Sequence, residues 1–192
     1  PAWQHPTAGH WDDQRIVGRD GRHFGPLPRE WVQYRGLYHH GDQVVLNYTV
    51  GESEILELPE VIEYGAAPIF VRHLNLNRVP QQLVTRLAPN DPTLNVTLAG
   101  YPEATIHRTE DAIELRLPAS ERPVQISIAL SKADQLTIQS LASEARDLEP
   151  LTKGGPARFG KTVIETRGEL GDESGPFAVD TITIPNASEN PW

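Results

Sequence analysis

The chain of 192 residues contains no cysteine and no methionine. Without cysteine it cannot form a disulfide, a thiolate nucleophile, a thiolate zinc site or the Cys-x-x-Cys-His attachment of a c-type haem. The lack of cysteine fits a reducing and an oxidising compartment equally well. Because there is no initiator methionine and the sequence runs from Pro1 to Trp192, we expect a processed mature protein or a domain cut from a longer one.

Long apolar runs and an excess of basic residues are missing as well. No apolar run approaches the roughly 20 residues of a membrane-spanning helix, so we expect no membrane span. The 17 Lys and Arg face 26 Asp and Glu, which gives a formal net charge of -9. An acidic chain disfavours nucleic acid and anionic membrane surfaces, because phosphate binding needs clustered Lys and Arg. We therefore expect no nucleic-acid partner.

Aromatic residues make up only 7% of the chain, whereas proline (17) and glycine (15) are plentiful. Runs of period-two alternation separated by turn residues are typical of a β-sandwich. We predict a single all-β domain, an antiparallel β-sandwich of about ten to fourteen strands with one short helix. Prolines are expected between the strands or at their edges, where a missing N–H costs no ladder bond. The expected strands are 34–39, 43–50, 53–58, 69–76, 82–87, 94–98, 105–108, 112–117, 124–130, 162–166 and 178–184, with a helix over 133–147 and an acidic turn over 168–175.

The domain has three expected parts. Residues 1–31 form an irregular segment packed on the sheet, because a loop this rich in aromatic rings loses too much by staying in water. Residues 32–150 form the sandwich core and end in the short helix. Residues 151–192 hold late strands and a linker towards an absent following domain.

The most charged turn of the chain is Gly18-Arg19-Asp20-Gly21-Arg22-His23. Arg19 and Arg22 could bind a carboxylate or phosphate bidentately, while Asp20 and His23 could bind sugar hydroxyls. The alternative is a structural turn in which Asp20-Gly21 takes a positive-φ bend and Asp20 pairs with a nearby arginine. The pattern favours the turn, and the four side chains remain a candidate ligand site.

Tryptophans near the N-terminus suggest a second candidate site. Trp11 and Trp31, together with Trp3, could form a platform on which sugar rings stack. Packing against the edge of the sheet is the alternative for at least two of these rings. Trp11 and Trp31 therefore join the candidate ligand-binding residues.

The patterns that would indicate catalysis or a metal are weak, so we assign no catalytic residue, no metal site and no cofactor. Adjacent strand residues point to opposite faces, so His39 and His40 are poor joint ligands. A Gly-x-Ser-x-Gly elbow is absent. Paired carboxylates of the kind a glycosidase needs remain open, because acidic residues surround one expected hairpin. These residues are Glu52, Glu54, Glu57, Glu60 and Glu63.

Several strings give the chain a family resemblance over nearly its whole length: DGRHFGPLPRE (20–30), YRGLY (34–38), YTVG (48–51), LTKGGP (151–156), VDTITIP (179–185) and the final NPW. The chain resembles the N-terminal region of large secreted multidomain proteins of planctomycetes and related bacteria. In these proteins a domain of unknown function precedes a β-propeller and a c-type cytochrome or haem-binding region. The resemblance implies a periplasmic or extracellular bacterial module whose partners are neighbouring domains of the parent protein.

These observations together predict a non-catalytic extracytoplasmic accessory module, either carbohydrate-binding or docking onto a neighbouring propeller. Carbohydrate is the first ligand class to test, because sandwiches with tryptophan and charged loops suit it. The alternatives are a glycan-active enzyme that uses paired carboxylates, and a pure interdomain scaffold. A groove with two convergent carboxylates would favour the enzyme. An apolar patch near residues 177–192 would favour the scaffold.

Overall fold

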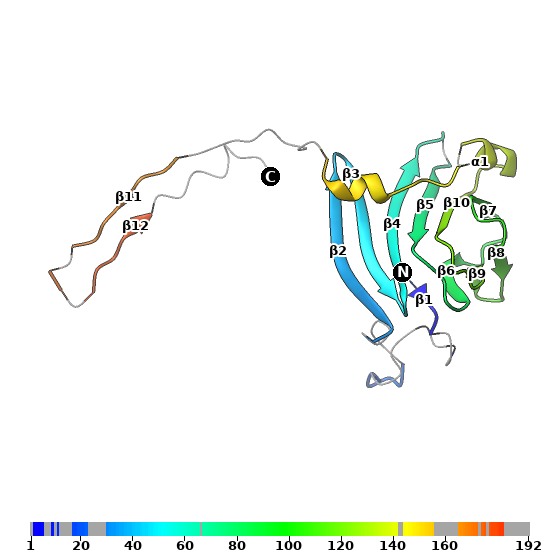
Figure 1. The fold of residues 1–192 in the computed structure, drawn as a ribbon, viewed down its shortest axis with the longest axis horizontal. Coiled ribbons are helices and arrows are strands. Elements are labelled where there is room, and N and C mark those ends of the chain that lie inside the picture. Colours follow the sequence, from blue (N-terminus) through cyan, green and yellow to red (C-terminus); the bar gives the residue numbers. More distant parts are fainter. Residues whose placement is uncertain are drawn as a thin grey trace. The chain divides into compact units, whose positions relative to one another are not determined.

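The structure is a computed structural model, which describes residues 2–5, 9, 11, 17–22, 30–65, 67–141, 144–155, 165–172, 174–175 and 177–182. Contacts within the chain divide it into two units, Pro1–Pro156 and Ala157–Trp192. The first unit contains two β-sheets, and the second contains a β-hairpin (Figure 1). The domain limits predicted from the sequence at residues 31 and 150 stay predictions.

The larger sheet has six antiparallel strands, in the spatial order β2-β3-β4-β5-β10-β7. Strands β2 to β5 follow one another as a meander, because tight turns such as that at Gly41 (φ 62°) join strands of alternating pattern. The long β10 then pairs with both β5 and β7. The bounds are β2 (Val32–His40), β3 (Gln43–Val50), β4 (Ser53–Ile62), β5 (Ile69–Leu76), β7 (Asn95–Ala99) and β10 (Val124–Ser131).

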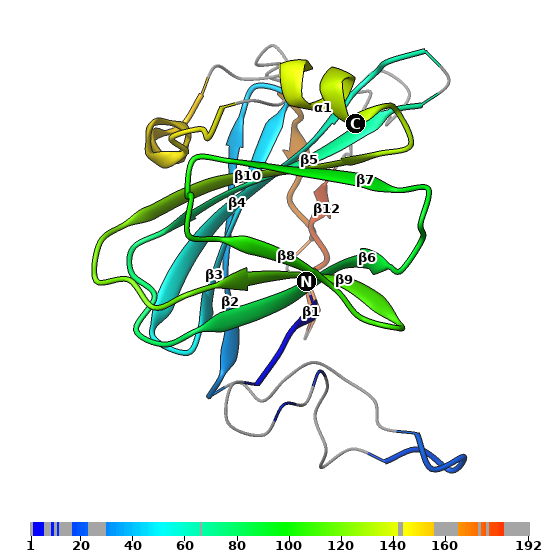
Figure 2. The same cartoon turned by 90° about the vertical axis from the view of Figure 1, so that its right-hand side faces the viewer.

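The smaller sheet has four antiparallel strands, in the order β1-β6-β9-β8. Figure 2 shows β6, β8 and β9 as a layer separate from β7 and β10. Its edge strand β1 places Trp3 in the core, with the side chain 1% exposed. The bounds are β1 (Ala2–Trp3), β6 (Leu83–Pro89), β8 (Thr105–Arg108) and β9 (Ala112–Leu117).

The main hydrophobic core lies between the two sheets, because one face of each contributes apolar side chains to a single cluster. Burial of a large aliphatic side chain stabilises the fold by about 1.5–3 kcal/mol. The opposite, outer face of the six-stranded sheet carries its own small cluster, where Val45 and Leu58 pack against Leu148 and Leu151. The core residues from both sheets include Tyr48, Ile55, Leu74, Ile126, Leu83, Leu115 and Leu117.

Two helical segments follow β10: the helix α1 (Gln135–Leu141) and the 3-10 turn η1 (Glu149–Lys153). Asp134 begins α1 by accepting a hydrogen bond from the Thr137 amide at 3.0 Å. The predicted helix over 133–147 was too long. Beyond the helix, the backbone of Arg146 and Leu148 is hydrogen-bonded to the side chain of Asn75 on β5, so it cannot continue a helical ladder there.

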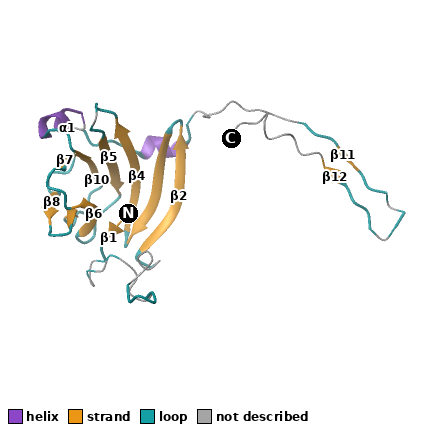
Figure 3. Cartoon of the chain, turned by 180° about the vertical axis from the view of Figure 1, so that it is seen from behind, coloured by secondary structure: helices purple, strands orange, loops and turns teal. Residues whose placement is uncertain are grey.

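The all-β sandwich with one short helix is confirmed (Figure 3). The ranges 43–50, 69–76, 105–108 and 112–117 agree with β3, β5, β8 and β9. Pro59 was wrongly placed outside a strand: it lies within β4 and pairs with Arg72. The register with β3 ends at Glu57, so β4 has one neighbour at Pro59, where a missing N–H is tolerated.

The second unit contains the hairpin of β11 (Gly168–Glu169) and β12 (Thr181–Ile182). The predicted strand 178–184 is confirmed only at β12 within the described residues. The predicted acidic turn over 168–175 was wrong at its start, because Gly168 and Glu169 pair with Ile182 and Thr181. Of the predicted strand 162–166, Glu165 and Thr166 are not in a strand, and 162–164 lie outside the described residues.

Candidate functional site

The charged turn at residues 18–22 has the structure of a local bend. Arg22 donates to Asp20 through its backbone amide (3.2 Å) and its Nε (2.6 Å), and Gly21 has a φ of 78°. The hydrogen bonds from Arg22 lower the pKa of the Asp20 carboxyl. Arg19 is exposed, and His23 lies outside the described residues. The carboxylate and one guanidinium satisfy each other here, and a ligand role for these residues stays a prediction.

The three tryptophans have separate surroundings. Trp3 donates from Nε1 to the Tyr48 hydroxyl (3.3 Å) inside the core, where a ligand cannot reach it. The Arg86 guanidinium carbon lies 4.1 Å from the ring centroid of Trp11. Trp31 lies against the β3–β4 turn, and a Cβ at Gly51, whose φ is 57°, would collide with its ring. Ligand binding by Trp11 and Trp31 stays a prediction.

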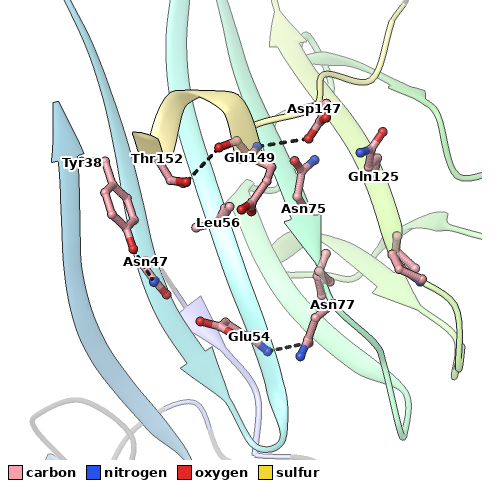
Figure 4. A pocket seen from close by; sticks show the side chains of 13 residues that line it. Tyr38, Asn47, Glu54, Leu56, Asn75, Asn77, Gln125, Asp147, Glu149 and Thr152 are labelled. Atoms are coloured by element: carbon pink, nitrogen blue, oxygen red, sulfur yellow. Dashed lines mark hydrogen bonds between the residues drawn. The ribbon is translucent and has the colours of Figure 1, made fainter. Parts of the chain in front are cut away.

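A polar groove lies on the outer face of the six-stranded sheet (Figure 4). Its volume is about 410 Å³, which is within the range of roughly 300–1,000 Å³ typical of small-molecule sites. Strands β2, β3, β4, β5 and β10 supply its floor, and the segment around η1 supplies one wall. The polar lining residues are Tyr38, Asn47, Glu54, Asn75, Asn77, Gln125, Asp147, Glu149 and Thr152.

The strand register builds the floor of this groove. Asn47 is the partner of Leu56, Leu56 of Asn75, and Asn75 of Gln125. Because directly paired residues in antiparallel strands point to the same face, these four side chains form one row across the sheet. Gly36 of β2 is the register partner of Asn47 and adds no side chain to that end of the row.

The wall of the groove is the segment Arg146–Thr152, which we name the strap. The Asn75 side chain fixes it by donating from Nδ2 to the Arg146 carbonyl (2.8 Å) and accepting from the Leu148 amide (2.6 Å). Leu148 and Leu151 anchor the strap in the outer cluster. Figure 4 shows the Glu149 side chain reaching down from η1 beside Asn75.

The polar groups of the groove are incompletely paired. Asn47 donates from Nδ2 to the Tyr38 hydroxyl at 3.4 Å, and its buried Oδ1 has no hydrogen-bond partner. Among the described residues, the carboxylates of Glu54, Asp147 and Glu149 make no ion pair, and the groove is lined by no Lys, Arg or His. The groove therefore offers many acceptors and several amide donors, without a cation.

Beside the strap, a chain of hydrogen bonds has the order of a serine hydrolase triad. Ser127 Oγ lies 2.6 Å from His73 Nδ1, and His73 Nε2 lies 3.0 Å from Glu60 Oε2. Arg146 donates to the other oxygen of Glu60 at 2.9 Å. Ser127 is only 1% exposed, so its hydroxyl cannot attack a substrate. These hydrogen bonds run from Ser127 through His73 and Glu60 to Arg146 and link the sheet to the strap. We name this hydrogen-bonded set of side chains the tie.

Charge and burial set the protonation of this tie. Burial lowers the pKa of His73, although Glu60 acts in the opposite direction. Burial alone would raise the pKa of Glu60, but the charge and hydrogen bond of Arg146, together with His73 and Gln43, outweigh burial and leave that pKa lowered. The neutral imidazole and the charged carboxylate are thus the favoured forms.

The acidic residues that suggested paired catalytic carboxylates lie apart. Glu57 is buried inside the sandwich, where it accepts from the Tyr48 hydroxyl (2.6 Å) and from Arg72 Nε (2.7 Å). Burial raises the pKa of Tyr48 well above its ordinary value, so the phenol keeps its proton. Glu60 belongs to the tie beside the strap, and Glu54 alone of the five lines the groove. Glu52 pairs with Arg78, and Glu63 is exposed.

A search of the described residues finds no group of three His, Asp or Glu side chains placed to bind a metal ion. Within the same residues, no helix has the length and apolar character to cross a membrane.

Sequence reasoning missed the row of amides on the groove floor. Asparagine is disfavoured inside strands, yet Asn47 stands between Leu46 and Tyr48, and Asn75 between Leu74 and Leu76. That pattern was the available signal. It could not show that the two strands place these amides in one row.

Comparison with protein families finds a similarity in the N-terminal part of the chain. A family model described as a domain of unknown function, DUF6797, matches residues 1–57. The matched region includes Asn47, Glu54 and Leu56 of the groove, while Asn75, Gln125 and the strap lie beyond it. No curated protein and no solved structure matches the chain.

Proposed function

We propose that this chain is a non-catalytic, extracytoplasmic accessory module of a larger protein, and that it binds carbohydrate through the groove beside the strap. The observation that carries the proposal is the row formed by Asn47, Leu56, Asn75 and Gln125 under a wall of carboxylates. Amides and carboxylates are the groups that hydrogen-bond to sugar hydroxyls. The resemblance to secreted multidomain proteins supports the location and the neighbouring domains as partners.

The charge of the groove narrows the ligand class. Glu54, Asp147 and Glu149 line it and no cation among the described residues offsets them. A uronic acid or a sulfated sugar would bring its negative charge next to these carboxylates, which disfavours binding. The expected ligands are therefore neutral or amine-bearing oligosaccharides.

Isothermal titration calorimetry of the full chain tests this function. The panel contains neutral, amine-bearing and uronic-acid oligosaccharides. Gln125→Ala should weaken binding about tenfold, since loss of one hydrogen bond to a ligand costs about 1.4 kcal/mol. Gln125 has an exposed side chain on the groove floor, so this change should leave the fold intact. Gln139→Ala, an exposed glutamine on α1, is the matched control and should bind as the unmodified chain does.

Two results would overturn the proposal. One is the absence of binding to every member of the panel. The other is binding that Gln125→Ala and Glu149→Gln both leave unchanged, because the ligand would then lie elsewhere.

A glycan-active enzyme is the second candidate, because Glu54 and Glu149 line one groove. A glycosidase needs one carboxyl that keeps its proton at neutral pH, which requires a raised pKa. The described carboxyls with a shifted pKa, at Asp20, Glu60, Asp91 and Asp134, all shift downward. Release of reducing ends from a panel sugar, abolished by Glu54→Gln, would favour the enzyme over the binding module.

A further inference from the structure

A second polar hollow adjoins the groove on the outer face of the six-stranded sheet. We name it the side hollow and define it by Gln33, Arg35, Thr49, Glu54 and Asn77. Its volume is about 570 Å³. Glu54 and Asn77 line both the groove and the side hollow, so the two share a border. They are two parts of one longer depression, which we name the trough.

The side hollow repeats the floor of the groove further along the same strands. Gln33 is the register partner of Thr49, and Thr49 is the partner of Glu54. The Asn77 amide donates to the Glu54 carbonyl at 3.1 Å and so extends this row beyond the end of β5. Thr49 stands two positions after Asn47 on β3, so the two rows share one face and lie about 7 Å apart. A ligand over the first row can therefore extend over the second.

Arg35 lines the side hollow at a bulge in β2. The register passes from Tyr34 opposite Tyr48 to Gly36 opposite Asn47, so Arg35 is the extra residue of the bulge. Bulges re-aim a side chain and are over-represented next to functional sites. Gly36 beside it has no side chain, and a Cβ there would meet nothing within 4 Å. The bulge thus presents one long basic side chain to the hollow, next to open space.

Arg35 and Glu54 both line the side hollow with their charges unpaired. Within the part of the chain that the structure describes, neither side chain makes an ion pair or a hydrogen bond. Arg78, the other cation that lines the hollow, is paired with Glu52 at 2.7 Å. The Asn77 side-chain oxygen accepts from the backbone amides of Glu54 and Arg78, both at 2.8 Å, which fixes its orientation. The side hollow therefore holds a guanidinium, a carboxylate and an oriented amide for a ligand.

We propose that the side hollow is a second sugar subsite and that the trough takes an extended neutral oligosaccharide. A sugar hydroxyl can accept a hydrogen bond from Arg35 while it donates one to Glu54, so one neutral group uses both charges. Hydrogen bonds with a charged partner are stronger than those between neutral groups. An anionic sugar would gain beside Arg35 and lose beside Glu54 and Glu52, which removes its advantage. The inference rests on the proposed carbohydrate binding and adds the length of the ligand to it.

Isothermal titration calorimetry of the full chain with oligosaccharides of increasing length tests this inference. The probes are the di-, tetra- and hexasaccharides of the cello-, manno- and xylo- series. In a series that binds, the hexasaccharide should bind at least about tenfold more tightly than the disaccharide held in the groove. Arg35→Ala should remove about tenfold from hexasaccharide affinity and leave disaccharide affinity unchanged, and the exposed position of Arg35 should keep the fold intact. Arg122→Ala is the matched control, because Arg122 is exposed and lines neither part of the trough.

The outcomes separate this inference from the function on which it rests. Hexasaccharide binding that Gln125→Ala weakens and Arg35→Ala leaves unchanged would overturn the second subsite and keep the groove as a sugar site. Equal affinity for all three lengths would overturn it as well. An equal loss at every length in Arg35→Ala would place the ligand in the side hollow alone and refute the extended trough. Absence of binding by all three series, together with the rest of the panel, would refute the proposed function itself.

Discussion

Replacing Asn75 by alanine should release the strap and lower the stability of the whole domain. The Asn75 side chain makes two hydrogen bonds to strap backbone, at 2.8 and 2.6 Å, in a partly buried position. Each such bond contributes about 1 kcal/mol net, and the Arg146 carbonyl and Leu148 amide would be left without their partner. We expect the free energy of unfolding to fall by about 2–3 kcal/mol, which is a decrease in Tm of roughly 4–12 °C for a chain of this size.

Chemical denaturation followed by tryptophan fluorescence measures this change. Asn77→Ala is the matched control, since Asn77 also accepts two backbone hydrogen bonds, from Glu54 and Arg78, but at an exposed position where water can replace it. The control should lose less than about 1 kcal/mol. Equal losses for the two variants would refute the idea that the strap is fastened by a buried amide.

Three further changes follow from the interior of the fold. The pKa of His73 is lowered from 6.5 in the folded protein, so the unfolded chain binds a proton at this imidazole more readily. The free energy of unfolding should therefore fall as the pH drops below about 6.5. Urea titrations at pH 7 and pH 5 should show this fall, and the fall should be smaller for His73→Gln. Arg72→Ala leaves the Glu57 charge buried without its cation and should cost about 3–5 kcal/mol by denaturation. Loss of less than 1 kcal/mol there would mean that water reaches Glu57. Gly51→Ala should lower the Tm, because the added Cβ meets the Trp31 ring at a position whose φ is 57°. Gly41→Ala is the control, since Gly41 has a similar φ of 62° and open space around it.

Local sequence pattern predicted the strands better than it predicted the site. Alternation placed β3 and β5 at their observed bounds, since burial of one face with exposure of the other is a property of neighbouring residues. The end of α1 depended on a distant side chain, Asn75, and no local signal could supply it. The groove depended on register between strands for the same reason.

Near the N-terminus, the sequence predicted a local turn but did not determine which tryptophan is buried. The Asp20-Gly21 bend was predictable because its hydrogen bonds are formed within the turn itself. Packing on the edge of the sheet was predicted for at least two of the tryptophans, but the sequence could not single out Trp3, because its burial follows from the pairing of β1 with β6, a strand more than 80 residues away. The side chains on the floor of the groove came from strand interiors instead.

The strap also determines when the groove can exist during folding. Its bonds join residues far apart in the chain: Arg146 to Gln43 across 103 positions and Leu148 to Asn75 across 73. Contacts at such separations form late, because a long loop must close before they contribute any stability. During synthesis, the meander β2–β5 emerges well before residue 148 and would present its outer face bare. A complete groove is therefore a sign that the domain has finished folding, and a ligand that needs the wall would bind the finished protein alone.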